Sequence, residues 1–195
     1  MKVSVVVAHP NTGASFNHAI TKTVCDMLTA QGHEVVLHDL YADNFDPILP
    51  LGEEKREENE LPQPIRQAMN DVRQSGGLIF IHPNWWGAPP AILKGWLDRV
   101  LRAGFAYRFT KDGPVQQMTD KIAQVFSTSN TPKEVEENVY KNPIEHFWKT
   151  IVFGLCGSRS FEYRNFEPVI VSTQEDRKRW LDEVAETIKR RFPAD

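Results

Sequence analysis

Short apolar runs recur along the chain, and each is followed by a stretch in which apolar residues return every three or four positions. A continuous apolar run is typical of a strand buried on both faces of a parallel sheet, whereas the wider spacing is typical of an amphipathic helix. The predicted strands cover residues 3–8, 34–38, 78–82, 121–127 and 169–172. The predicted helices cover residues 16–30, 64–75, 90–103, 143–153 and 175–191.

This alternation of strands and helices predicts an α/β fold, with a doubly wound five-stranded parallel sheet and helices on both faces. No repeat or linker divides residues 1–195, so we expect one domain. Residues 42–62 have no clear period and are predicted to form a solvated loop or a frayed helix. Ligands of such sheets bind beyond the carboxyl ends of the strands, which directs attention to loops 9–15, 83–89 and 127–142.

Composition narrows the possible classes of protein. With 41% hydrophobic and 25% charged residues, the chain is neither disordered nor collagen-like, and its net charge of −3 gives no general attraction to nucleic acid or anionic membranes. No apolar run approaches the ~18 residues of a membrane span, and the N-terminus is too strand-like for a signal peptide. Cys25 and Cys156 are isolated and predicted to be buried thiols, and the histidines lack metal-ligand spacing. We therefore expect a cytoplasmic protein without a metal site.

The loop after the first predicted strand offers groups that suit an anion. It contains a single glycine, Gly13, so the dinucleotide fingerprint with three glycines is absent. Hydroxyls at Thr12 and Ser15, the amide of Asn17 and the free N–H groups of a helix start could hold a phosphate or pyrophosphate. The alternatives are that Ser15 only caps the helix and that His9 is an ordinary histidine at a strand end.

Asp39, at the end of the second predicted strand, raises a different possibility. In a classical nicotinamide-binding fold an acid at this place binds the ribose, but the missing glycines argue against that fold. We expect Asp39 to cap a turn at residues 40–41 instead.

Two adjacent tryptophans follow the third predicted strand. Trp85 and Trp86 lie in a loop that Pro83, Pro89 and Pro90 stiffen, and packing alone explains the pair poorly. A rigid aromatic wall with backbone N–H groups suits a flat ligand with polar edges, such as an isoalloxazine ring. An aromatic hinge or a dimer contact is the alternative interpretation.

Several separate motifs agree in order and placement with one known family. They are Ala8-His9-Pro10, Ser15-Phe16-Asn17, Asp39-Leu40-Tyr41 with Asn44-Phe45-Asp46-Pro47, the run from Trp86 to Trp96, Asp98-Arg99-Val100 and Phe105-Ala106-Tyr107. Together they resemble the NAD(P)H:quinone oxidoreductase family of flavodoxin-like flavoproteins. The resemblance covers most of the first 130 residues, then thins, and returns near Ser172-Thr173 and Arg177.

The resemblance implies a flavin at the carboxyl edge of the sheet, often at a homodimer interface. It implies hydride transfer from NAD(P)H through the flavin to a quinone or similar small acceptor, with both substrates using one site in turn. Arg177 would lie near an adenosine, which favours FAD over FMN. The residues implied to bind the flavin are His9, Ser15, Phe16 and Asn17 at its phosphates, Pro83, Asn84, Trp85, Trp86 and Gly87 along the ring, Ser127, Thr128, Ser129 and Asn130 at the pyrimidine edge, and Arg177.

The sequence departs from the family pattern in two places. Of the usual aromatic pair facing the substrate, Tyr107 fits the first member, but Phe109 replaces the second. Residues 127–131 replace a Thr-Thr-Gly-Gly turn, although Ser129 and Asn130 could still present backbone N–H groups.

Beyond that turn, counting back from Trp148 puts Tyr140 where the family has a histidine, so Tyr107 and Tyr140 are the predicted catalytic residues. Three glutamates in the same segment, Glu134, Glu136 and Glu137, predict a solvated helix.

Two other functions remain open from the sequence. A one-electron carrier of the flavodoxin type would share the fold, and a flavin-binding regulatory subunit of a membrane transporter would share the motifs.

Overall fold

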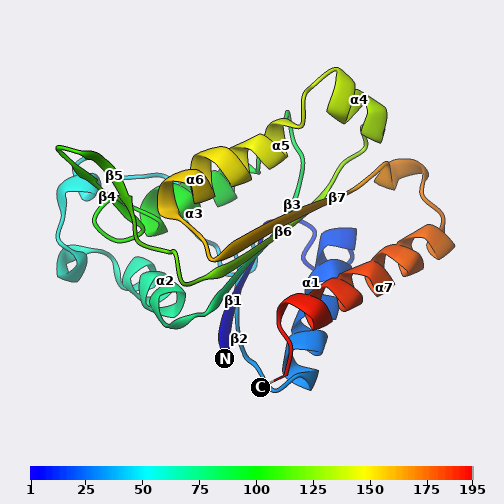
Figure 1. Cartoon of the computed structure of the whole chain (residues 1–195), viewed down its shortest axis with the longest axis horizontal. Coiled ribbons are helices and arrows are strands. Elements are labelled where there is room, and N and C mark those ends of the chain that lie inside the picture. The colour runs from blue at the N-terminus through cyan, green and yellow to red at the C-terminus, as the bar shows by residue number, and fades with distance from the viewer. Residues whose placement is uncertain (195) are drawn as a thin grey trace.

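The computed structural model describes residues 1–194, which form a five-stranded parallel sheet in the order β2-β1-β3-β6-β7 (Figure 1). The strands are β1 (Lys2–Val7), β2 (Glu34–Asp39), β3 (Gly77–Pro83), β6 (Ile122–Thr128) and β7 (Ser160–Phe166). Chain order reverses between β1 and β3, so this is the point where the loops after neighbouring strands diverge and leave a crevice. The predicted fold class is confirmed.

Helices cover both faces of the sheet. Helices α1 (Phe16–Ala30) and α7 (Gln174–Arg191) lie side by side on one face (Figure 1). The other face carries α2 (Gln63–Gln74), α3 (Ala91–Val100) and a continuous helical segment. That segment consists of α5 (Pro143–His146), a π-helical stretch (Phe147–Val152) and α6 (Phe153–Cys156), and the short α4 (Lys133–Asn138) precedes it.

Strand β3 explains why the central strands have continuous apolar runs. Every residue of β3 is buried, because successive side chains enter different cores. Ile79 and Ile81 pack with α1 and α7, whereas Leu78 and Phe80 pack with the helices of the opposite face. Burial on both sides favours apolar residues at successive positions, which is the pattern of residues 78–81.

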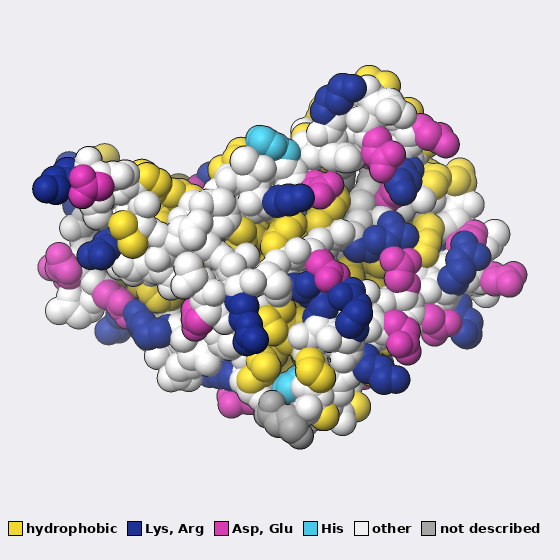
Figure 2. Space-filling model, in the orientation of Figure 1, with side chains coloured by type: hydrophobic (Ala, Val, Ile, Leu, Met, Phe, Trp, Pro, Cys, Tyr) yellow, Lys and Arg dark blue, Asp and Glu magenta, His cyan; other side chains and the backbone are white. Residues whose placement is uncertain are grey.

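The fifth strand is not where the sequence predicted it. Residues 169–172 were predicted as a strand, but Val169–Val171 form a 3₁₀ turn whose Ile170 side chain is 72% exposed. The fifth strand is β7, whose outward residues pair with α7 through Arg164–Glu183 and Glu162–Arg190. Figure 2 shows such basic and acidic side chains interleaved over this edge. Charged residues at alternate positions of an edge strand hid its strand character.

Two further elements differ from expectation. The strands β4 (Tyr107–Thr110) and β5 (Gly113–Gln116) form an antiparallel hairpin that was not predicted. Residues 42–62 contain two short 3₁₀ turns, and their acidic run is only partly solvated, because Glu53 is fully buried. The Glu53 carboxylate accepts from Nε and Nη2 of Arg99 in α3, both at 2.8 Å. This ion pair fixes the segment on the body of the protein.

Both cysteines are free thiols, as predicted; Cys156 is buried, as expected, whereas Cys25 is only half-buried. Burial raises the pKa of each thiol to about 11, so neither carries a thiolate at neutral pH. Within residues 1–194, no helix is both long enough and apolar enough to cross a membrane.

Candidate functional site

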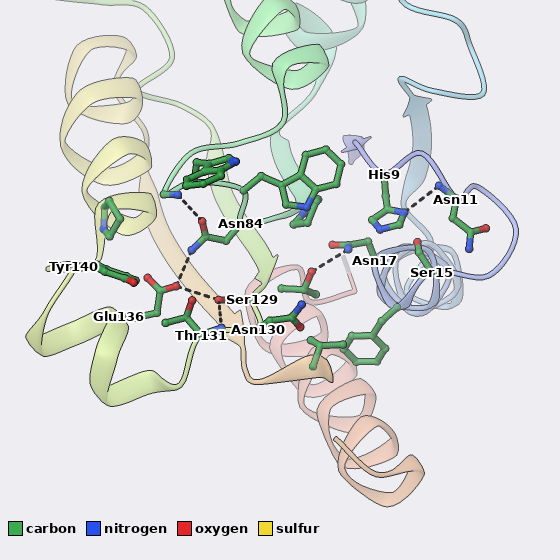
Figure 3. A pocket seen from close by; sticks show the side chains of 18 residues that line it. His9, Asn11, Ser15, Asn17, Asn84, Ser129, Asn130, Thr131, Glu136 and Tyr140 are labelled. Atoms are coloured by element: carbon green, nitrogen blue, oxygen red, sulfur yellow. Dashed lines mark hydrogen bonds between the residues drawn. The ribbon is translucent and has the colours of Figure 1, made fainter. Parts of the chain in front are cut away.

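A cavity of about 820 Å³ opens at the carboxyl ends of β1, β3 and β6, at the reversal of chain order. It unites three loops that are far apart in the sequence (Figure 3). Most of the predicted site residues border it: His9, Ser15, Phe16, Asn17, Pro83, Asn84, Trp85, Trp86, Gly87, Thr128, Ser129, Asn130 and Tyr140. Bordering residues that were not predicted are Asn11, Thr131, Glu136, Pro143 and Val169.

The first loop presents polar groups at the start of α1. Ser15 is the N-cap of α1, and its hydroxyl accepts from the His18 N–H at 3.2 Å. The Asn17 side chain donates from Nδ2 to Thr128 Oγ1 at 3.0 Å, while its Oδ1 is buried without a hydrogen-bond partner among the described residues. Ser15 therefore caps α1 and also borders the cavity.

The two histidines near this loop have different settings. Burial, together with neighbouring His18, lowers the pKa of His9, so the imidazole at the cavity is neutral at pH 7. His18 bonds to Asp39 through Nε2 at 2.9 Å. Asp39 also accepts from the Ala42 N–H at 3.2 Å, so it caps the turn as predicted.

The tryptophan loop is a tight turn with an uncommon residue at its tip. Trp85 and Ala88 exchange both backbone hydrogen bonds at 3.1 Å, and the two residues between them have positive φ, 58° at Trp86 and 70° at Gly87. Such a turn favours Asn-Gly, because a bulky residue at positive φ is strained. The fully exposed Trp86 indole makes no packing contribution that would explain this strain, which points to a functional role.

A buried histidine supports the base of this loop. His82 is fully buried, and burial lowers its pKa to about 4, so the ring is neutral. Its Nε2 accepts from Trp148 Nε1 at 2.9 Å, so Nδ1 carries the proton and donates to the Pro83 carbonyl at 2.9 Å. Trp148 is fully buried and packs in the core on this face of the sheet. The role of His82 was missed because nothing in the sequence links it to Trp148.

The acidic segment after β6 was wrongly predicted to be wholly solvated. Glu136 of α4 is only 6% exposed, and its Oε1 accepts from Asn84 Nδ2 at 2.9 Å and Ser129 Oγ at 3.0 Å (Figure 3). Ser129 lies seven residues before Glu136 in the same loop, but Asn84 follows β3, 52 residues away, so the sequence could not place it beside α4. Glu134 and Glu137 are exposed, as predicted.

Most backbone donors of the loops after β3 and β6 already have partners. The Asn84 N–H donates to the Thr128 carbonyl at 2.7 Å, and the Ser129 N–H donates to the Phe166 carbonyl at 3.0 Å, which removes Ser129 as a backbone donor to a ligand. Within residues 84–88 and 129–131, only the N–H groups of Trp86 and Asn130 have no acceptor among the described residues. These two remain available to a bound molecule.

Three predicted site residues lie away from the cavity in this chain. The Ser127 hydroxyl bonds to Tyr163 and Asn165, below the cavity floor. Arg177 donates to Ser172 Oγ at 2.8 Å and to the carbonyl of Val169. Tyr107 borders a separate apolar groove of about 340 Å³, on the side of α3 and α6.

Comparison with known proteins decides the family. A family model, Flavodoxin_2, described as a flavodoxin-like fold, matches residues 1–191. A Haemophilus influenzae protein named "Uncharacterized NAD(P)H oxidoreductase" is 33% identical over 193 residues, 97% of this chain and 95% of the relative. The human protein named ribosyldihydronicotinamide dehydrogenase (quinone) is 36% identical over 201 residues, 89% of this chain and 85% of the relative. This chain belongs to the NAD(P)H:quinone oxidoreductase family.

Solved structures agree with this family of flavodoxin-like proteins. Smu.1420 of Streptococcus mutans is 32% identical, with a TM-score of 0.86 over 97% of this chain and 100% of the other. The NAD(P)H:quinone oxidoreductase of Methanothermobacter marburgensis has a TM-score of 0.83 over 97% of this chain and 98% of the other, at 24% identity, and supports the fold alone. The sequence resemblance to the NAD(P)H:quinone oxidoreductase family is therefore confirmed.

Proposed function

We propose that this protein is a flavin-dependent NAD(P)H:quinone oxidoreductase. The observation that carries the proposal is the cavity at the reversal point of the sheet, which combines an aromatic loop, a helix start and free backbone N–H groups. A flavin has an aromatic ring, a phosphate and a polar ring edge. The aromatic loop matches the ring, the helix start matches the phosphate, and the free N–H groups match the polar edge.

The start of α1 suits the phosphate end of a flavin. Ser15 and Asn17 border the cavity at the start of α1, where the free N–H groups and the dipole of a helix favour an anion. Among the described residues that border the cavity, none is Lys or Arg. The phosphate would therefore be held by N–H and hydroxyl groups, and the orphaned Asn17 Oδ1 would accept from a hydroxyl of the flavin chain.

The tryptophan loop and the turn after β6 suit the ring. Trp85 offers an aromatic surface, and the free N–H groups of Trp86 and Asn130 can donate to acceptors on the pyrimidine edge. A flavin held there would supply hydride transfer between the nicotinamide and the quinone. Because the N–H groups of Trp86 and Asn130 are fixed in the fold, they would stabilise negative charge at that edge without reorganising. Tyr140, which borders the cavity and is 56% exposed, can donate to the quinone oxygen.

We propose FAD as the flavin, with support from the position of Arg177. Its guanidinium bonds to the carbonyl of Val169, a residue that borders the cavity, so an adenosine extending past Val169 would reach it. Mass analysis of the flavin released from purified protein tests this point. Release of FMN would remove Arg177 from the site and leave the reductase proposal in place.

We also propose that the enzyme is a cytoplasmic homodimer. Tyr107 borders an apolar groove, and exposed apolar side chains at Phe109 and Ile151 adjoin it. A second copy covering this groove would bury these side chains and could bring Tyr107 to the cavity of its partner.

One preparation of pure protein tests the central proposal. We expect a yellow protein with flavin absorbance that oxidises NADH or NADPH when a quinone is present and returns about one hydroquinone per nicotinamide. A one-electron carrier would turn over slowly unless a reductase is added. Co-purification with a transporter would favour the regulatory function, and a colourless protein that cannot be reconstituted with flavin would exclude all three.

A further inference from the structure

Glu136 is the single Asp, Glu, Lys or Arg among the described residues that border the cavity. The other bordering side chains are aromatic, apolar or neutral polar groups, and the low pKa of His9 keeps that imidazole uncharged. A molecule entering the cavity therefore meets one ionisable carboxylate and no cation to balance it.

The hydrogen bonds of Glu136 leave one oxygen free. Oε1 accepts from Asn84 and Ser129, which joins the loops after β3 and β6 through α4 (Figure 3). No residue of the described chain donates to Oε2. Two hydrogen bonds from neutral donors stabilise a carboxylate without cancelling its charge.

The charged groups packed around Glu136 do not neutralise it. A smaller cavity of about 170 Å³ behind it is also bordered by Lys133, Glu137, Glu145, Arg164 and Glu167. Within residues 1–194, Lys133 pairs with Glu137 at 3.7 Å, and Arg164 pairs with Glu183 at 2.6 Å and Glu167 at 3.9 Å. Neither cation forms an ion pair with Glu136. No neighbouring cation therefore offsets the negative charge of Glu136 on a molecule in the main cavity.

We propose that Glu136 determines the charge class of the electron acceptor: it admits neutral quinones and disfavours acceptors that carry a sulfonate or carboxylate. The inference rests on the proposed reductase function and adds a specificity residue to it. An anionic acceptor bound beside the buried carboxylate would meet repulsion that no neighbouring cation offsets, and like charges at this range discriminate between ligands.

The substitution Glu136→Gln removes the charge and keeps the hydrogen bonds. The Gln Oε1 can still accept from Asn84 and Ser129, and its amide takes the place of Oε2, which has no donor opposite it. Glu134→Gln is the matched control, because it removes the same charge from an exposed position of the same helix.

The assay compares kcat/KM for a neutral naphthoquinone and for its sulfonate in the three proteins. Intrinsic reactivity differs between the two quinones, but it cancels when each variant is compared with the wild type. We expect Glu136→Gln to raise the sulfonate-to-neutral ratio about fivefold, which corresponds to about 1 kcal/mol, and Glu134→Gln to leave it unchanged. A ratio that moves equally in both variants, or in neither, overturns the inference.

A binding measurement without turnover separates this inference from the proposed function. Quenching of tryptophan fluorescence gives the dissociation constants of both quinones for protein without nicotinamide, with or without flavin. The same fivefold change in the binding ratio is expected in Glu136→Gln. If the wild type binds no flavin, the reductase proposal fails and this ratio still decides the role of Glu136. Equal quinone binding ratios in wild type and Glu136→Gln overturn that role even in an active reductase.

Discussion

Trp86 shows how one residue can be costly for the fold and useful for the site. Its backbone lies at φ 58°, where a bulky side chain is strained, while its indole is fully exposed and stabilises nothing within the chain. The backbone N–H of the same residue is one of the two free donors in residues 84–88 and 129–131. A ligand that packs against the indole would supply the contact that offsets this backbone strain.

We expect Trp86→Asn to stabilise the protein and weaken its function. Asn tolerates positive φ, so relief of strain should raise the free energy of unfolding by about 0.5–1 kcal/mol. Loss of the indole should lower kcat/KM for quinone about tenfold, while the free N–H remains. Thermal denaturation of the flavin-free protein measures the first effect, and steady-state kinetics measure the second. A lower melting temperature would show that the indole packs within the protein after all.

At the residue scale, the sequence could predict candidate site residues whose position is set by neighbours in the same loop. Ser15 caps a helix, and Trp85 follows a strand, and both roles can be inferred from neighbours in the chain. Glu136 and His82 escaped prediction because their partners lie 52 and 66 positions away. Tyr107 was assigned by resemblance, and this chain alone places it in another groove.

At the scale of elements, the segment between β2 and α2 is attached to α3 by close contact and by a buried ion pair. Gly95 of α3 allows the contact, because a Cβ at that position would lie 2.2 Å from the Pro47 carbonyl oxygen. Arg99 Nη1 donates to the Asp46 carbonyl at 2.6 Å and pairs with the buried Glu53 through its other nitrogens. Residues 42–62 are therefore fixed to α3 at these points, although most of their side chains are exposed, as expected of a solvated loop.

We expect Arg99→Met to lower the free energy of unfolding by about 3–5 kcal/mol, because it leaves the Glu53 carboxylate buried without its cation. Adding Glu53→Leu should recover much of the loss, since an apolar pair avoids the buried charge. Urea denaturation of the single and double variants measures both effects.

The exposed pair Lys94–Asp98 on the same helix provides the control for this experiment. Lys94→Ala should change the free energy of unfolding by no more than about 0.5 kcal/mol. A similar loss in Arg99→Met and Lys94→Ala would contradict the buried ion pair as the attachment.

The strands that are buried on both faces were predicted from the sequence, whereas the edge strand that carries charged residues was missed. Strands β1, β3 and β6 are buried on both faces and consist mainly of apolar residues. Edge strand β7 alternates charged and apolar residues, whereas the apolar run 169–172 is an exposed turn. A single sequence does not distinguish an apolar run that is buried in the sheet from one that is exposed beside a site.

At the scale of the whole molecule, the apolar groove on the side of α3 and α6 remains open in one chain. Tyr107 and Ile151 border it, and Phe109 lies on the adjacent hairpin with 70% of its side chain exposed. Exposed apolar side chains grouped around a groove are typical of an interface between proteins. The proposed homodimer would cover the groove and supply Tyr107 to the site of the second copy.

We expect Ile151→Glu to convert the dimer to a monomer, because covering the groove would bury a charged carboxylate in place of an apolar side chain. Flavin should stay bound, since the residues proposed to hold it lie in the cavity of the same chain. Quinone turnover should fall at least about tenfold if Tyr107 acts across the interface. Analytical ultracentrifugation, flavin absorbance and steady-state kinetics on the same sample measure the three effects.

Leu37→Glu is the matched control, because it places the same charge at an exposed apolar residue of β2, far from the groove in chain order and on an edge strand of the sheet. This variant should remain dimeric and active. A monomeric Ile151→Glu protein with full turnover would show that each chain carries a complete site and that Tyr107 has no catalytic role. If the wild-type protein is already a monomer, the groove is an open surface of one chain and a second copy takes no part in the mechanism.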